Sequence, residues 1–442
     1  MWICCQIGAR EHYAVPRALH EQGLLAGLVT DWYAFTKKNT EKLKTETLKS
    51  ESKSVFGVRN GLDHLVQRQF QHFSISAFQR FGGASARAAR CEAIPDELVH
   101  AFPLRSLLWK WRVRRLAAQG RSYEAYCQTD AAFARAVARL QLPPHEVLFG
   151  YSYASLEILE MEKKRGVLTV LDQIDPGAVE FRRVAEEMKQ HPEIAGPAPD
   201  FPIAYYERNR REWELADIII VNSEWSRQAL ISEGADPAKI DILPLAYGAE
   251  DGGRTTEDRG QKTEVRTPAS APLRVLWLGQ VNVRKGIHYL MAAGRLLEDE
   301  NIQFEVVGPV GILPEAVAAA PRNMTFHGPV SRDRAADWYR QSDVFVLPTL
   351  SDGFALTQLE ALAHGLPVIT TPNCGRVIEE GKTGFIVPPR DPQALANAVL
   401  KFVADRNLST RMSPDCREAI TRFSINRYGQ NMVRMINVFR PK

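Results

Sequence analysis

Short apolar runs followed by helix-length segments are the feature that most limits what this chain can fold into. The runs Arg274–Gly279, Met324–His327 and Val344–Pro348 each have the length of a strand, and a segment with helical periodicity follows each of them. Such runs carry apolar side chains on both faces, which is typical of strands in a parallel sheet covered by helices on both sides. The pattern therefore predicts an α/β fold.

The N-terminal half repeats this pattern in Leu25–Thr30, Val147–Tyr151 and Asp217–Asn222. A chain of 442 residues is too long for one ordinary core. The polar segment 250–272 lacks periodicity, which is typical of a linker. We expect two Rossmann-like domains, residues 1–249 and 273–412, facing each other across a cleft at the carboxyl ends of their strands. An amphipathic C-terminal helix, residues 413–442, is expected to return to the N-terminal domain.

Composition indicates a globular enzyme, with 45% hydrophobic and 24% charged residues. The start of the chain lacks a basic leader, and no apolar stretch reaches the length needed to span a bilayer. The six cysteines form no Cys-x-x-Cys pair, so they are expected to be reduced and to bind no metal. These features favour a cytoplasmic location.

Positive charge is concentrated in residues 36–122, which we interpret as a basic insertion. This segment has 17 Lys/Arg and 7 Asp/Glu, a local charge of +10 in a chain whose net charge is +4. Within it, Leu104, Leu107, Leu108 and Trp111 have the spacing of one helix face. The segment suits a peripheral contact with an anionic membrane at its inner face, a phosphorylated acceptor, or a solvated surface. No nucleic-acid partner is expected.

The most informative motif is the stretch 348–375, PTLSDGFALTQLEALAHGLPVITTPNCG. A strand ends at Pro348, a loop carries Asp352, and a helix is expected to begin near Ala355. The start of that helix offers unpaired amides and the positive end of a dipole to an anion. Glu360 follows one and a half turns later, and Gly365 ends the helix. The motif predicts a pocket with two carboxylates beside an anion site.

A second motif, LWLGQVNVRKG in residues 276–286, places cations at the end of another strand. Arg284 and Lys285 lie in the loop, and Gly286 allows the turn into the next helix. Cations at the carboxyl end of a parallel strand lie where a diphosphate would bind.

The two motifs together resemble those of the retaining glycosyltransferases of family 4, which have the GT-B fold. The resemblance covers about residues 274–404 and extends more loosely to the N-terminal half. It implies that Glu360 binds the ribose of a nucleotide and that Asp352 binds the donor sugar. It also implies that Lys285 neutralises the leaving diphosphate. A second basic residue of the family is replaced by Gln280, and we expect Arg284 to substitute for it. The implied donor-binding residues are Gly279, Gln280, Gly328, Gly353, Phe354, Ala355, Leu356, Thr357 and Glu360, and the implied catalytic residues are Lys285, Arg284 and Asp352.

On the acceptor side, the loop 8–12 resembles the family's first loop, which faces donor and acceptor. We expect Gly8, Arg10, His12 and Tyr151 on this side, although Tyr151 stands where the family often has histidine. Asp172 and Asp175 end a strand and either contact the acceptor or serve as surface and capping groups.

The implied reaction transfers a hexosyl group from a nucleoside diphosphate sugar to a hydroxyl of a glycan, lipid-linked or small-molecule acceptor. No metal cofactor is expected, because the chain has no Asp-x-Asp, and Glu298–Glu300 lies at the end of an expected helix. Two alternatives stay open, namely a sugar phosphorylase and a catalytically inactive binding module on the same scaffold.

Overall fold

Two parallel sheets form the body of the protein in a computed structural model that describes residues 1–8, 13–33, 94–248 and 271–439. The first sheet has seven strands in the order β3-β2-β1-β4-β5-β6-β7, and every neighbouring pair is parallel. Its strands are β1 (Trp2–Gln6), β2 (Leu25–Thr30), β3 (Val99–Ala101), β4 (Val147–Tyr151), β5 (Leu168–Gln173), β6 (Ile218–Val221) and β7 (Ile240–Ile242).

The second sheet has six parallel strands in the order β10-β9-β8-β11-β12-β13. These are β8 (Leu273–Leu278), β9 (Ile302–Val307), β10 (Met324–Gly328), β11 (Val344–Leu347), β12 (Val368–Thr370) and β13 (Gly384–Ile386). In both sheets the strand order reverses direction beside the first strand of the unit, at β1/β4 and at β8/β11. At such switch points, open α/β sheets bind ligands beyond the carboxyl ends of their strands.

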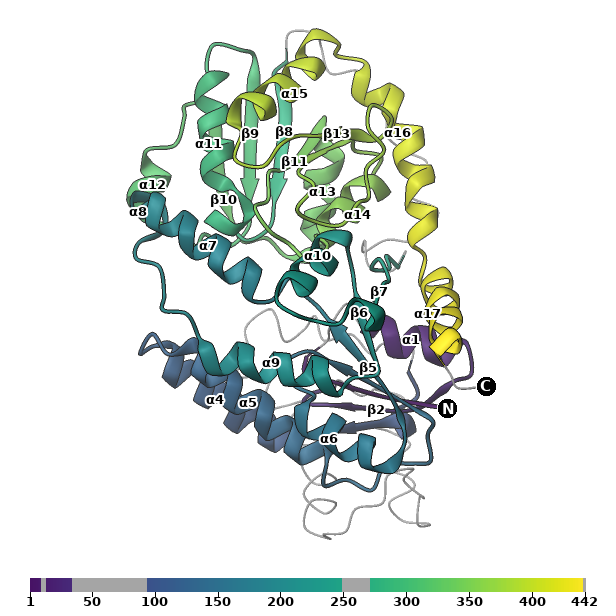
Figure 1. The fold of residues 1–442 in the computed structure, drawn as a ribbon. Helices are drawn as coiled ribbons and strands as arrows, with labels where there is room; N and C mark the ends of the chain where they lie inside the picture. The colour runs from purple at the N-terminus through teal and green to yellow at the C-terminus, as the bar shows by residue number, and fades with distance from the viewer. Residues whose placement is uncertain (9–12, 34–93, 249–270, 440–442) are drawn as a thin grey trace, which may run out of the picture.

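Helices cover both faces of each sheet, as the apolar runs predict (Figure 1). Those of the first half are α1 (Ala14–Glu21), α4 (Pro103–Ala117), α5 (Ser122–Val137), α6 (Leu156–Arg165), α7 (Ala178–Gln190), α8 (Pro192–Ala195), α9 (Ile203–Leu215) and α10 (Glu224–Ser232). Those of the second half are α11 (Ile287–Leu296), α12 (Pro314–Ala318), α13 (Arg332–Gln341), α14 (Leu356–Ala363), α15 (Pro392–Ala404), α16 (Leu408–Ala419) and α17 (Ile425–Phe439).

Local sequence signals set the helix ends that matter for the site. Ser223 caps α10 by accepting a hydrogen bond from the backbone N–H of Ser226, as its position predicts. Gly365 follows α14 with a φ of 71°, and its neighbour Leu366 donates back to the carbonyl of Ala361 at 2.9 Å. These bonds satisfy carbonyls at the end of α14, so the chain turns sharply into β12.

The C-terminal segment crosses from the second half of the molecule to the first (Figure 1). Helix α16 packs near α14, and α17 lies against α1, where Met432 and Ile436 are fully buried. Gly429 allows this contact, because a Cβ there would lie 3.1 Å from the Cβ of Ala18. The predicted fold class, two Rossmann-like halves with a returning C-terminal helix, is confirmed.

The interpretation of 36–122 as a basic insertion is wrong for its final part. Residues 34–93 lie outside the described residues, but residues 99–101 form β3 at the edge of the first sheet and α4 packs on α5. A three-residue edge strand is too short to produce a periodic signal. Most of the expected linker 250–272 also lies outside the described residues.

Helix α7 and the short helix α8 were not identified from the sequence, and they lie between the two halves (Figure 1). The Glu187 carboxylate of α7 accepts hydrogen bonds from the side chains of His288, Tyr289 and Arg390 in the second half. The backbone N–H of Leu313 donates to the carbonyl of Ile194 at 2.8 Å. Burial opposes the charged form, yet the three side-chain donors lower the pKa of Glu187 to about 2. An ionised Glu187 therefore joins the two halves.

Among the described residues, no helix combines the length and the apolar character needed to cross a membrane.

Candidate active site

The two sequence motifs meet at one point, where the side chains of Lys285 and Asp352 form an ion pair. Arg284 lies beside them, with its Nη1 3.7 Å from Asp352 Oδ2. The Lys285 and Asp352 side chains are each largely buried, at 13% and 12% exposed. The structure thus brings together the three residues that the resemblance implies are catalytic.

Backbone packing fixes the Arg284–Lys285 loop in this place. The side chain of Asn282 accepts a hydrogen bond from the backbone N–H of Lys285 at 3.0 Å. The carbonyl of Arg284 accepts from the backbone N–H of Leu350 at 2.9 Å, which ties the two motifs together. Gly286 makes the approach possible, since a Cβ there would lie 1.9 Å from the carbonyl oxygen of Pro348. The glycine is thus required by the contact between the loops.

The Asp352 loop is held from its other side by the segment after β12. The backbone N–H of Asp352 donates to the carbonyl of Asn373 at 2.9 Å. The ring of Phe354 packs flat on Gly375, where a Cβ would lie 2.3 Å from the ring. Gln358 donates to the carbonyl of Phe354 at 2.9 Å. Asp352 is consequently presented from a rigid loop.

Helix α14 starts from a strained residue. Ala355 adopts a left-handed conformation, with φ 67° and ψ 79°, immediately before the first residue of the helix. This region is costly for a residue with a Cβ, at about 1–3 kcal/mol, and such strain is found preferentially at functional sites. The amides of Leu356 and Thr357 belong to the first turn, where intrahelical partners are lacking. The strained cap thus begins, directly after Asp352, a helix terminus of the kind to which anions bind in proteins.

Glu360 lies one and a half turns along α14 and is oriented by a residue that the sequence did not single out. Tyr339 of α13, which is 1% exposed, donates its hydroxyl proton to Glu360 Oε2 at 2.7 Å. The Tyr339 ring in turn stacks on His364, with centroids 5.2 Å apart. Burial and the nearby Glu360 carboxylate raise the pKa of Tyr339, so the phenol stays a proton donor.

A further carboxylate enters this cluster from α7. Glu180 Oε2 lies 3.6 Å from Arg284 Nη1, so Arg284 stands between Glu180 and Asp352. Burial raises the pKa of Glu180, and the positive charge of Arg284 opposes that shift. Burial and the adjacent Arg284 lower the pKa of Lys285 to about 7. An incoming diphosphate would favour the protonated lysine.

The opposite half of the molecule contacts the Asp352 loop through Gly353. A Cβ on Gly353 would lie 2.4 Å from the carbonyl oxygen of Ile174 and 2.8 Å from the side-chain nitrogen of Asn222. Trp225 Nε1 also donates to Ser351 Oγ at 3.0 Å. Glycine at position 353 therefore lets the two halves close on each other.

The remaining donor-side residues surround the carboxyl ends of β8, β9 and β10. Gly279 follows β8 with a φ of 153°, and its N–H donates to the carbonyl of Val307 at 3.0 Å. Gln280 is exposed, and Gly328 ends β10 with a φ of 69°. They belong to the same edge of the sheet as Lys285.

Of the four residues expected on the acceptor side, Gly8 and Tyr151 are among the described residues. The backbone N–H of Gly8 donates to Asp31 Oδ1 at 2.7 Å, at the end of β1. Tyr151 is buried at the end of β4, with its ring 5.6 Å from that of Phe149, and so packs in the core. Arg10 and His12 lie outside the described residues.

One group of side chains in the described part of the chain has the arrangement of metal ligands. The ligand atoms of Glu187, His191 and His288 lie within 4.8 Å of one another. Glu187 is already hydrogen-bonded to Tyr289 and Arg390, which explains the group as a polar contact between the two halves. It is separate from the Lys285–Asp352 pair, so it does not bear on the expected absence of a catalytic metal.

Comparisons with solved structures identify the fold as GT-B. Sucrose-phosphate synthase from Thermosynechococcus elongatus matches with a TM-score of 0.58 at 18% identity, covering 99% of this chain and 98% of that one. Anabaena HepE in complex with UDP matches with a TM-score of 0.58 at 13% identity, covering 99% of this chain and 100% of that one. At these identities the likeness establishes the architecture alone.

At the level of sequence, residues 272–405 match the family model described as glycosyl transferases group 1. The D-inositol 3-phosphate glycosyltransferase of Xylanimonas cellulosilytica is 28% identical over 225 residues, covering 47% of this chain and 54% of that protein. The protein of the same name from Streptomyces avermitilis is 31% identical over 180 residues, covering 35% and 39% of the two chains. The chain thus spans about half the length of the curated relatives that it matches.

Proposed function

We propose that this protein is a glycosyltransferase that moves a hexosyl group from a nucleoside diphosphate sugar to an acceptor hydroxyl, with retention of configuration. The observation that carries the proposal is the cluster formed by Lys285, Arg284 and Asp352 at the start of α14. The match of residues 272–405 to glycosyl transferases group 1 covers both motifs of this cluster. Solved relatives of the same fold include HepE with UDP and with UDP-glucose.

In this proposal the protein positions the substrates and stabilises the leaving group. Lys285, Arg284 and the first amides of α14 receive the charge that develops on the diphosphate. Glu360 holds the ribose hydroxyls, and Asp352 exchanges its contact with Lys285 for the hydroxyls of the donor sugar. The bond from the anomeric carbon to the diphosphate breaks, and its electron pair leaves with the diphosphate. The acceptor oxygen then bonds to the same face of that carbon.

Two alternatives predict different products. A sugar phosphorylase would release a sugar 1-phosphate from a glycan, whereas the proposed enzyme releases a nucleoside diphosphate. An inactive binding module would bind a nucleotide and release nothing. The buried Lys285–Asp352 pair argues against the inactive module. Burying two charges costs desolvation free energy, and a module without catalysis would gain nothing in return for that cost.

The direct test is a thermal-shift comparison of UDP, GDP and ADP, each alone and as its glucose or mannose conjugate. A ligand that binds the native state raises its stability by RT ln(1 + [L]/Kd), so about 100 Kd of ligand adds about 2.7 kcal/mol. We expect one base to raise the melting temperature clearly. If no nucleotide in this panel raises it, the proposal is wrong.

We also expect turnover to persist in excess EDTA. Transferases that hold Mg²⁺ or Mn²⁺ do so through clustered acids, whereas here two cationic side chains and a helix terminus lie where the diphosphate would bind. The measurement is nucleoside diphosphate release with and without chelator. Loss of activity that added Mg²⁺ or Mn²⁺ restores would remove the leaving-group role of Lys285.

A second proposal concerns α4, which we infer binds an anionic lipid bilayer. Its sequence has five Lys/Arg and no Asp/Glu. Leu107, Leu108 and Trp111 are exposed by 46%, 67% and 59%. Exposed apolar side chains on a basic helix are typical of helices that lie in the membrane interface, where each cation near an anionic surface contributes about 1 kcal/mol.

Sedimentation with vesicles tests this proposal. Wild-type protein should pellet with phosphatidylglycerol-containing vesicles, less so at high salt, and stay in the supernatant with pure phosphatidylcholine. The double variant Leu108→Glu/Trp111→Glu should lose binding. Val438→Glu, at an apolar residue of α17 that is 79% exposed, should keep it. Equal recovery in the supernatant with both lipids would leave α4 as a solvated helix.

A further inference from the structure

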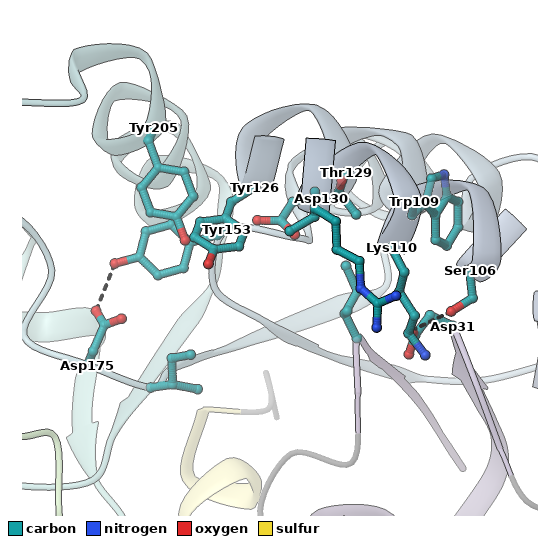
Figure 2. Close-up of a pocket in the computed structure, with 14 residues that line it drawn as sticks. Asp31, Ser106, Trp109, Lys110, Tyr126, Thr129, Asp130, Tyr153, Asp175 and Tyr205 are labelled. Atoms are coloured by element: carbon teal, nitrogen blue, oxygen red, sulfur yellow. Dashed lines mark hydrogen bonds between the residues drawn. The ribbon is translucent and has the colours of Figure 1, made fainter. Parts of the chain in front are cut away.

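A cavity of about 500 Å³ opens at the carboxyl ends of the first sheet, apart from the Lys285–Asp352 pair. Its floor includes Asp31 after β2 and Asp175 after β5, and α4, α5 and Tyr205 of α9 wall it (Figure 2). The volume is in the range of sites for small organic ligands. Of the residues that line the cavity, only Asp175 was a candidate for contact with the acceptor from the sequence.

The walls combine aromatic faces with charges of both signs. Tyr153 and Tyr205 stack with centroids 4.3 Å apart and planes at 8°. Tyr126 of α5, which is 43% exposed, lines the same end of the cavity (Figure 2). Among the described residues that line the cavity, the charged groups are three carboxylates and two cations, so these residues carry no excess of positive charge.

This combination favours an uncharged, hydroxyl-rich ligand. Carboxylates accept hydrogen bonds from hydroxyl groups, lysine and arginine donate to them, and aromatic faces pack against the C–H groups of a sugar ring. A phosphate-bearing ligand would instead meet more carboxylates than cations among the described lining residues. The cavity therefore suits a neutral sugar or polyol residue.

Three hydrogen bonds fix the Asp175 carboxylate at one end of the cavity. Its Oδ1 accepts hydrogen bonds from the Tyr153 hydroxyl at 2.7 Å, from the Gly177 N–H at 2.9 Å and from Gln173 Nε2 at 3.1 Å. Figure 2 shows Asp175 and Tyr153 together at the end opposite Lys110 and Ser106. Because these three donors all bind Oδ1, none of them occupies the second carboxylate oxygen, which can accept a hydrogen bond from a ligand hydroxyl.

The same end of the cavity adjoins the donor loop. Ile174, the residue before Asp175, lines the cavity, and its carbonyl oxygen faces Gly353. Asn222 Nδ2 donates to that carbonyl at 3.1 Å. Asp175 directly follows Ile174 in the chain, so it lies one residue from the carbonyl group that contacts the Asp352 loop. A hydroxyl bound at Asp175 would lie on the donor side of the cavity.

We propose that this cavity binds the acceptor, that the acceptor is an uncharged sugar or polyol residue, and that Asp175 accepts a hydrogen bond from the attacking hydroxyl. The inference rests on the proposed transferase function. The hydroxyl oxygen bonds to the anomeric carbon of the donor, and the bond from that carbon to the diphosphate breaks. As that bond forms, the hydroxyl proton passes to the Asp175 carboxylate, which then releases it to solvent and is ionised again for the next turnover.

Binding is tested first, without any donor. Saturation-transfer NMR with methyl hexopyranosides and with hexose 6-phosphates should show transfer to one or more of the neutral glycosides. Asp175→Asn and Tyr126→Ala should weaken it, whereas Asp200→Asn, at an exposed carboxylate of the same half, should keep it. Absence of transfer to all glycosides, a preference for the phosphates, or unchanged transfer in both pocket variants would overturn the inference.

Turnover separates the roles of the two residues. With the best-binding glycoside as acceptor, Asp175→Asn should lower kcat by about 100-fold, on the scale of losing one positioned proton acceptor. Tyr126→Ala should raise the acceptor KM and leave kcat unchanged. Donor affinity, measured by thermal shift, should be unchanged in both variants. Glycoside binding without any response to nucleotides would defeat the transferase proposal but leave the cavity as a sugar site.

Discussion

Replacing Lys285 with alanine should lower kcat by about 100-fold or more. Removing a single preorganised group that stabilises developing charge costs roughly this much in enzymes. Lys285 is fixed by the bond from its backbone N–H to Asn282, and its ammonium group lies beside Asp352 in a largely buried place. The measurement is the rate of nucleoside diphosphate release at saturating donor and acceptor.

Two controls separate lost catalysis from lost folding. Lys382→Ala removes a lysine of the same half whose side chain is 51% exposed, and its kcat should match the wild type. The Lys285→Ala variant should still show a cooperative melting transition, because Arg284 remains 3.7 Å from Asp352 to balance its charge. A folded Lys285→Ala variant with a kcat within a few-fold of the wild type would remove Lys285 from the leaving-group site.

The two motifs that carry Lys285, Arg284 and Asp352 could be recognised in the sequence because each is short and rigid. Gly286 and Gly353 lie where a neighbouring backbone carbonyl leaves no room for a Cβ. A glycine at these positions therefore indicates that another segment of the chain packs closely against the loop. The order of strands and helices followed from apolar runs that are buried on both faces. Ion pairing between Lys285 and Asp352, 67 residues apart, became visible only in three dimensions.

Residues that act across the two halves could not be predicted in the same way. Glu180 and Glu187 belong to α7, whose many charged residues give no signal of burial until the second half packs on it. Asp175 was a candidate from its place after a strand, but its three hydrogen-bond donors and the cavity around it depend on α4, α5 and α9. Tyr151 was expected at the acceptor from a family position, whereas the structure buries it in the core.

Replacing Glu360 with alanine should weaken binding of the preferred nucleoside diphosphate by about 10- to 100-fold. A hydrogen bond to a charged group contributes roughly 1.5–3 kcal/mol, and every 1.4 kcal/mol changes a dissociation constant tenfold. Glu360 lies on α14 one turn beyond the amides that would hold the diphosphate, and in the proposal it binds the adjoining ribose. Calorimetric titration measures the change. Glu315→Ala, at an exposed glutamate of the same half, should bind as the wild type does.

Tyr339 tests whether this loss comes from an oriented carboxylate. Tyr339→Phe removes the hydroxyl that donates to Glu360 Oε2 and keeps the ring that stacks on His364. We expect it to weaken nucleotide binding by a smaller factor than Glu360→Ala, because the carboxylate remains but loses its fixed orientation. In the Glu360→Ala background the same change should have no further effect, since residues that act through one interaction are not additive. Equal losses in both backgrounds would mean that Tyr339 acts on the nucleotide independently, and an unchanged dissociation constant for Glu360→Ala would exclude Glu360 from the nucleotide site.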